Sequence, residues 1–147
     1  MTMDLSSLFT AQNRRLFKLT LALKGGQELL LESFSGYEGL SAGFGFQLEL
    51  LSDDSAVKLK TAMGQSATIE IELATGSSRF INGHVLSFGS NGSDGGMCRY
   101  SAVIGSWLSL LEQRFDSRIY QDQTVEQVIS QVFSRYEGLA KYEFRVQ

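Results

Sequence analysis

Apolar residues occur at every second position in several short stretches of this chain, and this alternation strongly limits its possible folds. In residues 17–23, Phe and Leu alternate with Lys, Thr and Ala, and the stretches 44–50 and 67–73 repeat the pattern. A period of two is typical of strands with one buried and one solvated face. With three further strand-like stretches, the sequence predicts six strands, at residues 17–23, 28–34, 44–50, 67–73, 79–88 and 97–104.

Glycine replaces proline at the predicted turns. The 147 residues include fifteen Gly and no Pro, whereas about 5% Pro is average. Gly25-Gly26 predicts a hairpin between the first two strands, and the Gly-rich stretch 89–96 is expected to be a surface loop. Apart from the segment at 56–63, the connections are too short to hold crossover helices, so we expect an antiparallel β-barrel or strongly bent sheet over residues 1–104.

The periodicity becomes helical after Gly105, and residues 105–147 are expected to form a separate helical segment. A short helix is predicted at 107–111, and an amphipathic helix at 124–136 with Thr124 and Gln127 as its capping box. Its packing face is expected to consist of Val125, Val128, Ile129, Val132 and Phe133. A third, short helix is predicted at 56–63, begun by a cap within 52–55. The expected fold is therefore mainly β with minor α.

Composition argues against several classes of function. Thirteen basic and sixteen acidic residues give a net charge of −3, and nonspecific nucleic-acid binding needs a basic face. The apolar stretches are too short for a membrane anchor, and no cleaved signal peptide is evident at the N-terminus. A single Cys fits folding in a reducing cytoplasm without disulfides.

Residues able to carry catalysis are scarce. Symmetric pairing of 80–88 with 97–104 would place Cys98 opposite Ser87, with His84 on the other face of the sheet, so they are not expected to form a nucleophile and base. The lone His has no partner at metal-ligand spacing. The stretch 89–96 lacks the Lys-Ser/Thr ending of a phosphate-binding loop. We therefore expect no catalytic residue, no metal and no cofactor.

Residues 114–125, the motif segment, lie between the two C-terminal helices and carry no evident chemistry. They are predicted to form a short strand with Ile119 and Tyr120. Asp116 is expected to pair with Arg114 or Arg118, and Asp122 lies near the helix start, where negative charge is favourable.

The motif segment resembles the signature of the VgrG family, the spike proteins of bacterial type VI secretion. The matching residues are Arg114, Asp116, Ser117, Arg118, Ile119, Tyr120, Gln121, Thr124 and Val125, which follow Trp107-Leu108 and precede Val132-Phe133. Residues 34–41, 59–64 and 80–85 extend the resemblance upstream. Family members often have Pro before the Trp and after the Thr-Val, where this chain has Gly105-Ser106 and Glu126.

The resemblance implies an antiparallel β-barrel of the phage tail hub type. In the family, three chains form a ring that matches the hexameric Hcp tube, and a later region forms the needle. The implied partners are further copies of the chain as a homotrimer, the Hcp-like tube, baseplate proteins and effectors. The implied route is assembly in the cytoplasm, then secretion without a cleaved signal peptide. The matching residues imply a structural motif, with no catalytic residue among them.

Two other functions remain open from the residues alone. The chain could be a stand-alone ligand-binding β-barrel, or the non-catalytic adaptor part of a larger effector enzyme. A ligand-binding barrel needs an internal cavity, whereas the inward-facing Phe17, Leu19, Phe46 and Leu48 are large enough to fill a small barrel.

Overall fold

The computed structural model describes residues 16–23, 28–94 and 96–145. The chain divides into two compact units, Met1–Ser106 and Trp107–Gln147. The first unit contains all six strands, and the second contains the helical elements that follow them.

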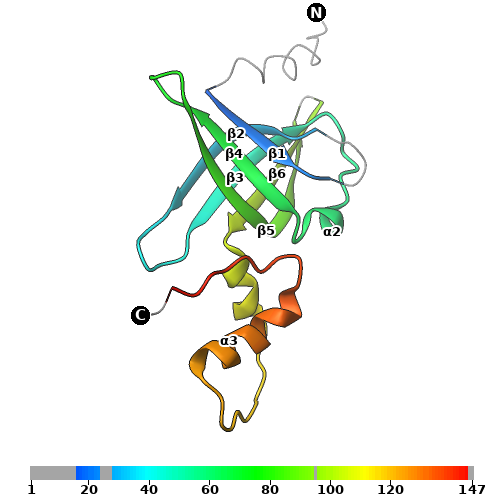
Figure 1. Ribbon diagram of the computed structural model, residues 1–147. Helices are drawn as coiled ribbons and strands as arrows, with labels where there is room; N and C mark the ends of the chain where they lie inside the picture. The colour runs from blue at the N-terminus through cyan, green and yellow to red at the C-terminus, as the bar shows by residue number, and fades with distance from the viewer. Residues whose placement is uncertain (1–15, 24–27, 95, 146–147) are drawn as a thin grey trace, which may run out of the picture. The chain divides into compact units, whose positions relative to one another are not determined.

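The first unit is a six-stranded antiparallel sheet, bent into a half-barrel (Figure 1). The strand order is β1-β4-β5-β6-β3-β2. The six predicted strands and the mainly β fold class are confirmed. Their bounds are β1 Phe17–Leu21, β2 Leu30–Tyr37, β3 Gly45–Ser52, β4 Ser66–Glu72, β5 Ser78–Asp94 and β6 Met97–Gly105.

The predicted hairpin between the first two strands is wrong in its pairing. β1 pairs with β4 and β2 pairs with β3, which places β1 and β2 at opposite edges of the sheet. The sheet curls so that its two edges approach each other. There the rings of Phe17 and Phe34 pack edge-on, with 5.6 Å between their centroids. Gly25-Gly26 lies outside the described residues. The alternation of apolar and polar residues indicates which face of a strand is buried. It does not indicate which other strand lies beside it in the sheet.

The sequence predicts a surface loop over the Gly-rich stretch 89–96, and this prediction is wrong for residues 89–94, which form a strand. β5 continues through it to Asp94 and pairs with β6, with a register irregularity between Ser90 and Ser93. Cys98 therefore lies opposite Ser93, and the predicted register with Ser87 is wrong. Backbone hydrogen bonds to the neighbouring strand hold a stretch whose side chains alone give no strand signal.

Large apolar side chains fill the inside of the half-barrel. Leu19, Phe46 and Leu48 are buried as predicted, and Phe17 packs partly buried against them. The most completely buried side chains of this core come from five strands and are Leu31, Leu48, Leu50, Ile69, Val85, Tyr100 and Ile104.

The helix predicted at 56–63 is reduced to one turn, α2 Leu59–Ala62. It has no side-chain cap. Instead, Ser52 and Asp54 stabilise the preceding turn, because Ser52 Oγ accepts the Asp54 N–H and Asp54 Oδ1 accepts the Ala56 N–H. Gly64, at φ +73°, ends the segment, which agrees with the sequence.

The second unit contains a 3-10 helix η2 (Trp107–Gln113), the helix α3 (Val125–Phe133) and a 3-10 turn η3 (Ser134–Tyr136). Both hydrogen bonds of the predicted capping box between Thr124 and Gln127 are present. An aromatic cluster holds the unit together, with Phe133 contacting Trp107 at 4.7 Å and Tyr142 at 4.8 Å between ring centroids. Val125 does not join the packing face, because its side chain is 74% exposed.

In the part of the chain that the structure describes, no helix has the length and apolar character needed to cross a membrane.

Candidate functional site

The motif segment is extended between η2 and α3, and its residues alternate between two environments. Arg114, Asp116, Arg118 and Tyr120 line a pocket of the second unit. Between them, Phe115 is 98% exposed and Ile119 is 87% exposed. This is the period of a strand, although residues 114–120 pair with no strand among the described residues. The predicted strand is thus an extended segment without a ladder.

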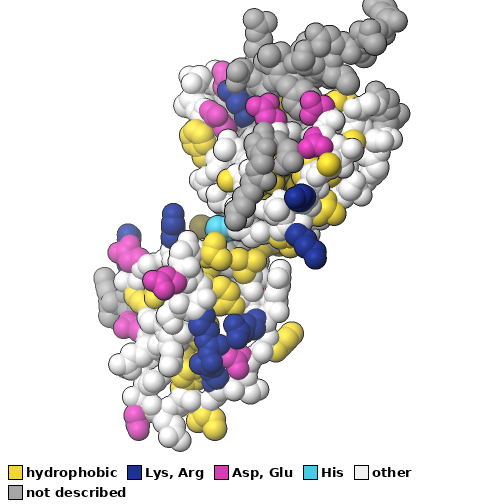
Figure 2. Space-filling view, turned by 90° about the vertical axis from the view of Figure 1, so that its right-hand side faces the viewer, with side chains coloured by type: hydrophobic (Ala, Val, Ile, Leu, Met, Phe, Trp, Pro, Cys, Tyr) yellow, Lys and Arg dark blue, Asp and Glu magenta, His cyan; other side chains and the backbone are white. Residues whose placement is uncertain are grey.

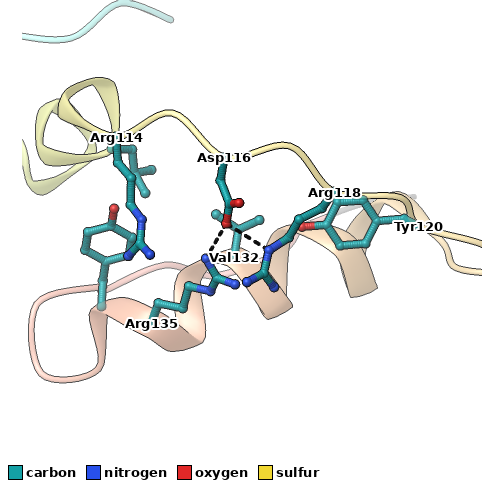
Figure 3. Close-up of a pocket in the computed structure, with 8 residues that line it drawn as sticks. Arg114, Asp116, Arg118, Tyr120, Val132 and Arg135 are labelled. Carbon is teal, nitrogen blue, oxygen red and sulfur yellow. Dashed lines mark hydrogen bonds and ion pairs between the residues drawn. The ribbon is translucent and has the colours of Figure 1, made fainter.

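The pocket has a volume of about 330 Å³, and we call it the arginine pocket. Figure 3 shows the side chains of the motif segment on one side and those of Val132 and Arg135 on the other. The described residues that line it are Leu111, Arg114, Asp116, Arg118, Tyr120, Val132, Arg135 and Tyr136. Apolar, aromatic and charged groups therefore meet in one small cavity.

Asp116 is the only acidic group of the arginine pocket and binds two of its three guanidinium groups. Its Oδ2 accepts hydrogen bonds from Arg118 Nε at 2.8 Å and from Arg135 Nη1 at 2.7 Å (Figure 3). The pairing predicted with Arg118 is therefore present, and the alternative with Arg114 is not among the ion pairs of the described residues. One carboxylate thus connects the motif segment with the turn after α3.

Arg135 was missed by the sequence reasoning. A signal existed, because Arg135 follows Val132 by three positions, and such residues share one helical face. The apolar periodicity of that face does not by itself indicate that the charged residue at its end has a role.

The arginine pocket has an excess of positive charge. Three guanidinium groups face one carboxylate, and the side chain of Arg114 has no hydrogen bond or ion pair among the described residues. Figure 2 shows basic side chains gathered around an acidic one on this unit. The pocket is therefore suited to receive a negatively charged group.

The other motif residues lie outside the pocket lining. Ser117, Ile119 and Gln121 are exposed, and Val125 is exposed at the helix start. Thr124 caps α3. Asp122 has a left-handed backbone with φ +52° and comes just before the cap. The structure thus brings together four of the nine motif residues and gives a fifth a capping role.

The described residues contain no group of three or more His, Cys, Asp or Glu side chains that could hold a metal ion. Cys98 is part of the buried core, while the ring Nδ1 of His84 lies 3.4 Å from the carbonyl oxygen of Gly64. The two side chains therefore have separate surroundings.

Comparison with known protein families identifies the family of this chain. The model of the phage tail baseplate hub (GPD) family matches residues 37–147, well over half of the chain. The chain belongs to this family. The matched range includes the whole arginine pocket and four of the six strands completely.

Three similar proteins are type VI secretion system spike proteins of Pseudomonas aeruginosa. VgrG1b is 34% identical over 133 residues, VgrG1c is 33% identical over 133 residues, and VgrG4b is 30% identical over 143 residues. These matches cover 90–95% of this chain and 17–18% of each relative. The resemblance to the VgrG family is confirmed, and the chain spans about a fifth of the length of these relatives.

A solved structure shows the same fold. The E. coli c3393 protein, described as a component of the type VI secretion system with structural similarity to the T4 bacteriophage tail proteins gp27 and gp5, superimposes with a TM-score of 0.68. The match covers 84% of this chain and 33% of that protein, at 23% identity. The phage tail hub architecture is therefore confirmed at the level of the fold.

Proposed function

We propose that this chain is the structural hub portion of a type VI secretion spike. In this proposal, three copies form part of a ring that connects an Hcp-like hexameric tube to a membrane-puncturing needle during effector delivery. The observation that carries the proposal is membership of the baseplate hub family over residues 37–147. The type VI spike relatives, similar over nearly the whole chain, support the same role.

The proposal extends to the parts of the chain and their partners. Residues 1–104 act as the barrel of the hub, and residues 105–147 begin its next part. The protein assembles in the cytoplasm and leaves through the secretion apparatus, with baseplate proteins and effectors as further partners. The role is structural and not enzymatic, in keeping with relatives that are spike proteins.

The surface of the second unit supports a role in assembly. Phe115, Ile119 and Val125 all belong to the motif segment, and all three expose large apolar side chains. All three side chains are available to contact a neighbouring protein in the assembly. By contrast, the interior of the half-barrel is filled by buried side chains, which favours a hub over a ligand-binding barrel.

A secretion assay tests the proposal in the organism that encodes the protein. Deletion of residues 37–147 from the complete gene is expected to abolish release of the Hcp-like tube protein into the medium. Restoring the intact gene should restore release. Unchanged release in the deletion strain, with no second spike gene expressed, would contradict the structural role.

The contribution of the exposed motif side chains can be tested separately. Phe115→Ser combined with Ile119→Ser is expected to reduce release strongly while leaving the abundance and melting temperature of the protein unchanged, because both side chains are exposed. Leu40→Ser is the matched control, since Leu40 is fully exposed on the first unit. Equal effects of the two changes would argue against a specific interface at the motif segment.

A further inference from the structure

The arginine pocket is a local exception to the charge of this chain. Three of the thirteen basic residues and one of the sixteen acidic residues line it, so elsewhere acidic residues outnumber basic ones by fifteen to ten. A positive pocket on a negatively charged protein favours binding of a small acidic group. A long polyanion would also meet the acidic surface around the pocket, which would repel it.

Two of the three guanidinium groups are held by Asp116 and still have donors without a partner among the described residues. Arg118 and Arg135 each donate one hydrogen bond to Asp116 Oδ2, and a guanidinium has five N–H donors. Arg114 donates none to the described residues through its side chain. Because Asp116 orients two of the three groups in advance, a ligand would find them ordered at a small entropic cost.

We propose that the arginine pocket is a docking site for an acidic segment of another protein, which inserts a Glu or Asp side chain flanked by apolar residues. This inference goes beyond the proposed hub role and does not depend on it. Arg114 and the free donors of Arg118 and Arg135 bind the carboxylate, since guanidinium and carboxylate groups pair in a bidentate geometry.

The dimensions and lining of the pocket favour a side chain on a peptide. A volume of about 330 Å³ accommodates only a few side chains. Leu111 and Val132 provide apolar contacts for the methylene groups of a Glu and for an apolar neighbour, while Tyr120 and Tyr136 also line the cavity. A free phosphate would use the guanidinium groups and leave these apolar surfaces without a contact.

A second copy of this chain is a less suitable occupant. Some of its described carboxylates already have partners: Glu32 pairs with Arg99, Glu38 pairs with Arg79, and Glu70 accepts the Ser78 hydroxyl. Glu49 lies on β3, between β6 and β2, where flanking strands restrict its entry into a small cavity. We assign the occupant to a different polypeptide on the positive charge and the apolar lining of the pocket, and a second copy is an outcome that the test below distinguishes.

A peptide titration tests this site on the 147-residue protein. The probe is a terminally blocked hexapeptide of sequence Gly-Leu-Glu-Leu-Glu-Gly, added to nitrogen-15-labelled protein. We expect saturable chemical-shift changes at amides of residues 114–120 and 132–136. The same peptide with Gln at both Glu positions should bind about tenfold more weakly, because hydrogen bonds to charged groups contribute more than neutral ones.

Two matched variants localise the binding. Arg114→Gln is expected to weaken binding about tenfold without lowering the melting temperature, because the Arg114 side chain has no partner among the described residues to lose. Arg145→Gln removes the same charge from the same unit outside the pocket and should bind as the wild type does.

Several results would overturn the proposal. These are absence of binding, equal binding of the Glu and Gln peptides, equal losses in the two Arg variants, and displacement of the peptide by an equal concentration of inorganic phosphate. Concentration-dependent shifts of the same amides without peptide would identify a second copy as the occupant and also contradict it. None of these outcomes affects the secretion assay, so failure of the site and failure of the hub role are distinguishable.

Discussion

Asp116 accepts a hydrogen bond at 2.7 Å from Arg135, which lies nineteen residues later in the chain. The same carboxylate oxygen accepts the Nε–H of Arg118 at 2.8 Å. The extended motif segment has no strand partner in the described part of the chain. Asp116 therefore contributes a direct link between this segment and the helical part of the second unit.

Replacing Asp116 by Ala should loosen the motif segment. The change removes both ion pairs and leaves three guanidinium groups without a carboxylate. We therefore expect the free energy of unfolding to fall by about 1 kcal/mol, the upper range for partly exposed pairs. Amide hydrogen exchange of residues 114–120 should become faster. Glu143→Ala, which breaks the more exposed pair with Arg145, is the control and should have no measurable effect. Equal effects would contradict the linking role.

Thr124→Ala should destabilise α3 at its first turn. The hydroxyl of Thr124 accepts the Gln127 N–H, while the Gln127 side chain accepts the Thr124 N–H. Loss of such a cap costs about 1 kcal/mol. We expect faster amide exchange in residues 125–128, measured by nuclear magnetic resonance. Gln123→Ala, one position earlier, should leave these rates unchanged, and a similar increase there would count against the cap.

Gly36→Ala should be much more damaging than Gly43→Ala. A Cβ on Gly36 would clash with the Gly45 carbonyl oxygen and with Phe46 Cδ1, whereas a Cβ on Gly43 would have no atom within 4 Å. Overpacking of this kind costs about 1–3 kcal/mol. Urea denaturation followed by circular dichroism should show the difference. Similar midpoints for the two variants would contradict the close approach of β2 and β3.

Tyr100 should make stability depend on alkaline pH. Burial raises the pKa of its phenol above the ordinary value of 10.0, and the hydroxyl donates to the Asp54 carbonyl at 2.9 Å. The protonated phenol therefore contributes to the free energy of unfolding. This contribution is complete below pH 10 and is lost as the pH rises through the folded-state pKa.

Tyr100→Phe tests this dependence. We expect a loss of about 1 kcal/mol at pH 7, because the variant lacks the hydrogen bond, and a shallower decline above pH 10 than in the wild type. Parallel declines in the two proteins would show that Tyr100 does not cause the alkaline loss. Thermal unfolding at a series of pH values provides the measurement.

Local patterns were sufficient to predict much of this protein. The alternation at 67–73 depends on neighbouring residues only, and so do the capping box at Thr124 and the helical stop at Gly64, and all three agree with the structure. These features involve interactions within a few residues, which the order of amino acids specifies directly. The family resemblance was likewise present in the motif segment itself.

Long-range pairings required the tertiary structure. The sequence could not place β1 beside β4, because every strand with the same alternation offers an equivalent buried face. It could not show that β5 extends to Asp94, because that extension depends on hydrogen bonds to β6. Nor did it bring Arg135 to Asp116, since nothing near Asp116 in the chain specifies a partner beyond α3. The strands and the capped helix were thus determined locally, whereas the strand order and the arginine pocket were decided by contacts that only folding creates.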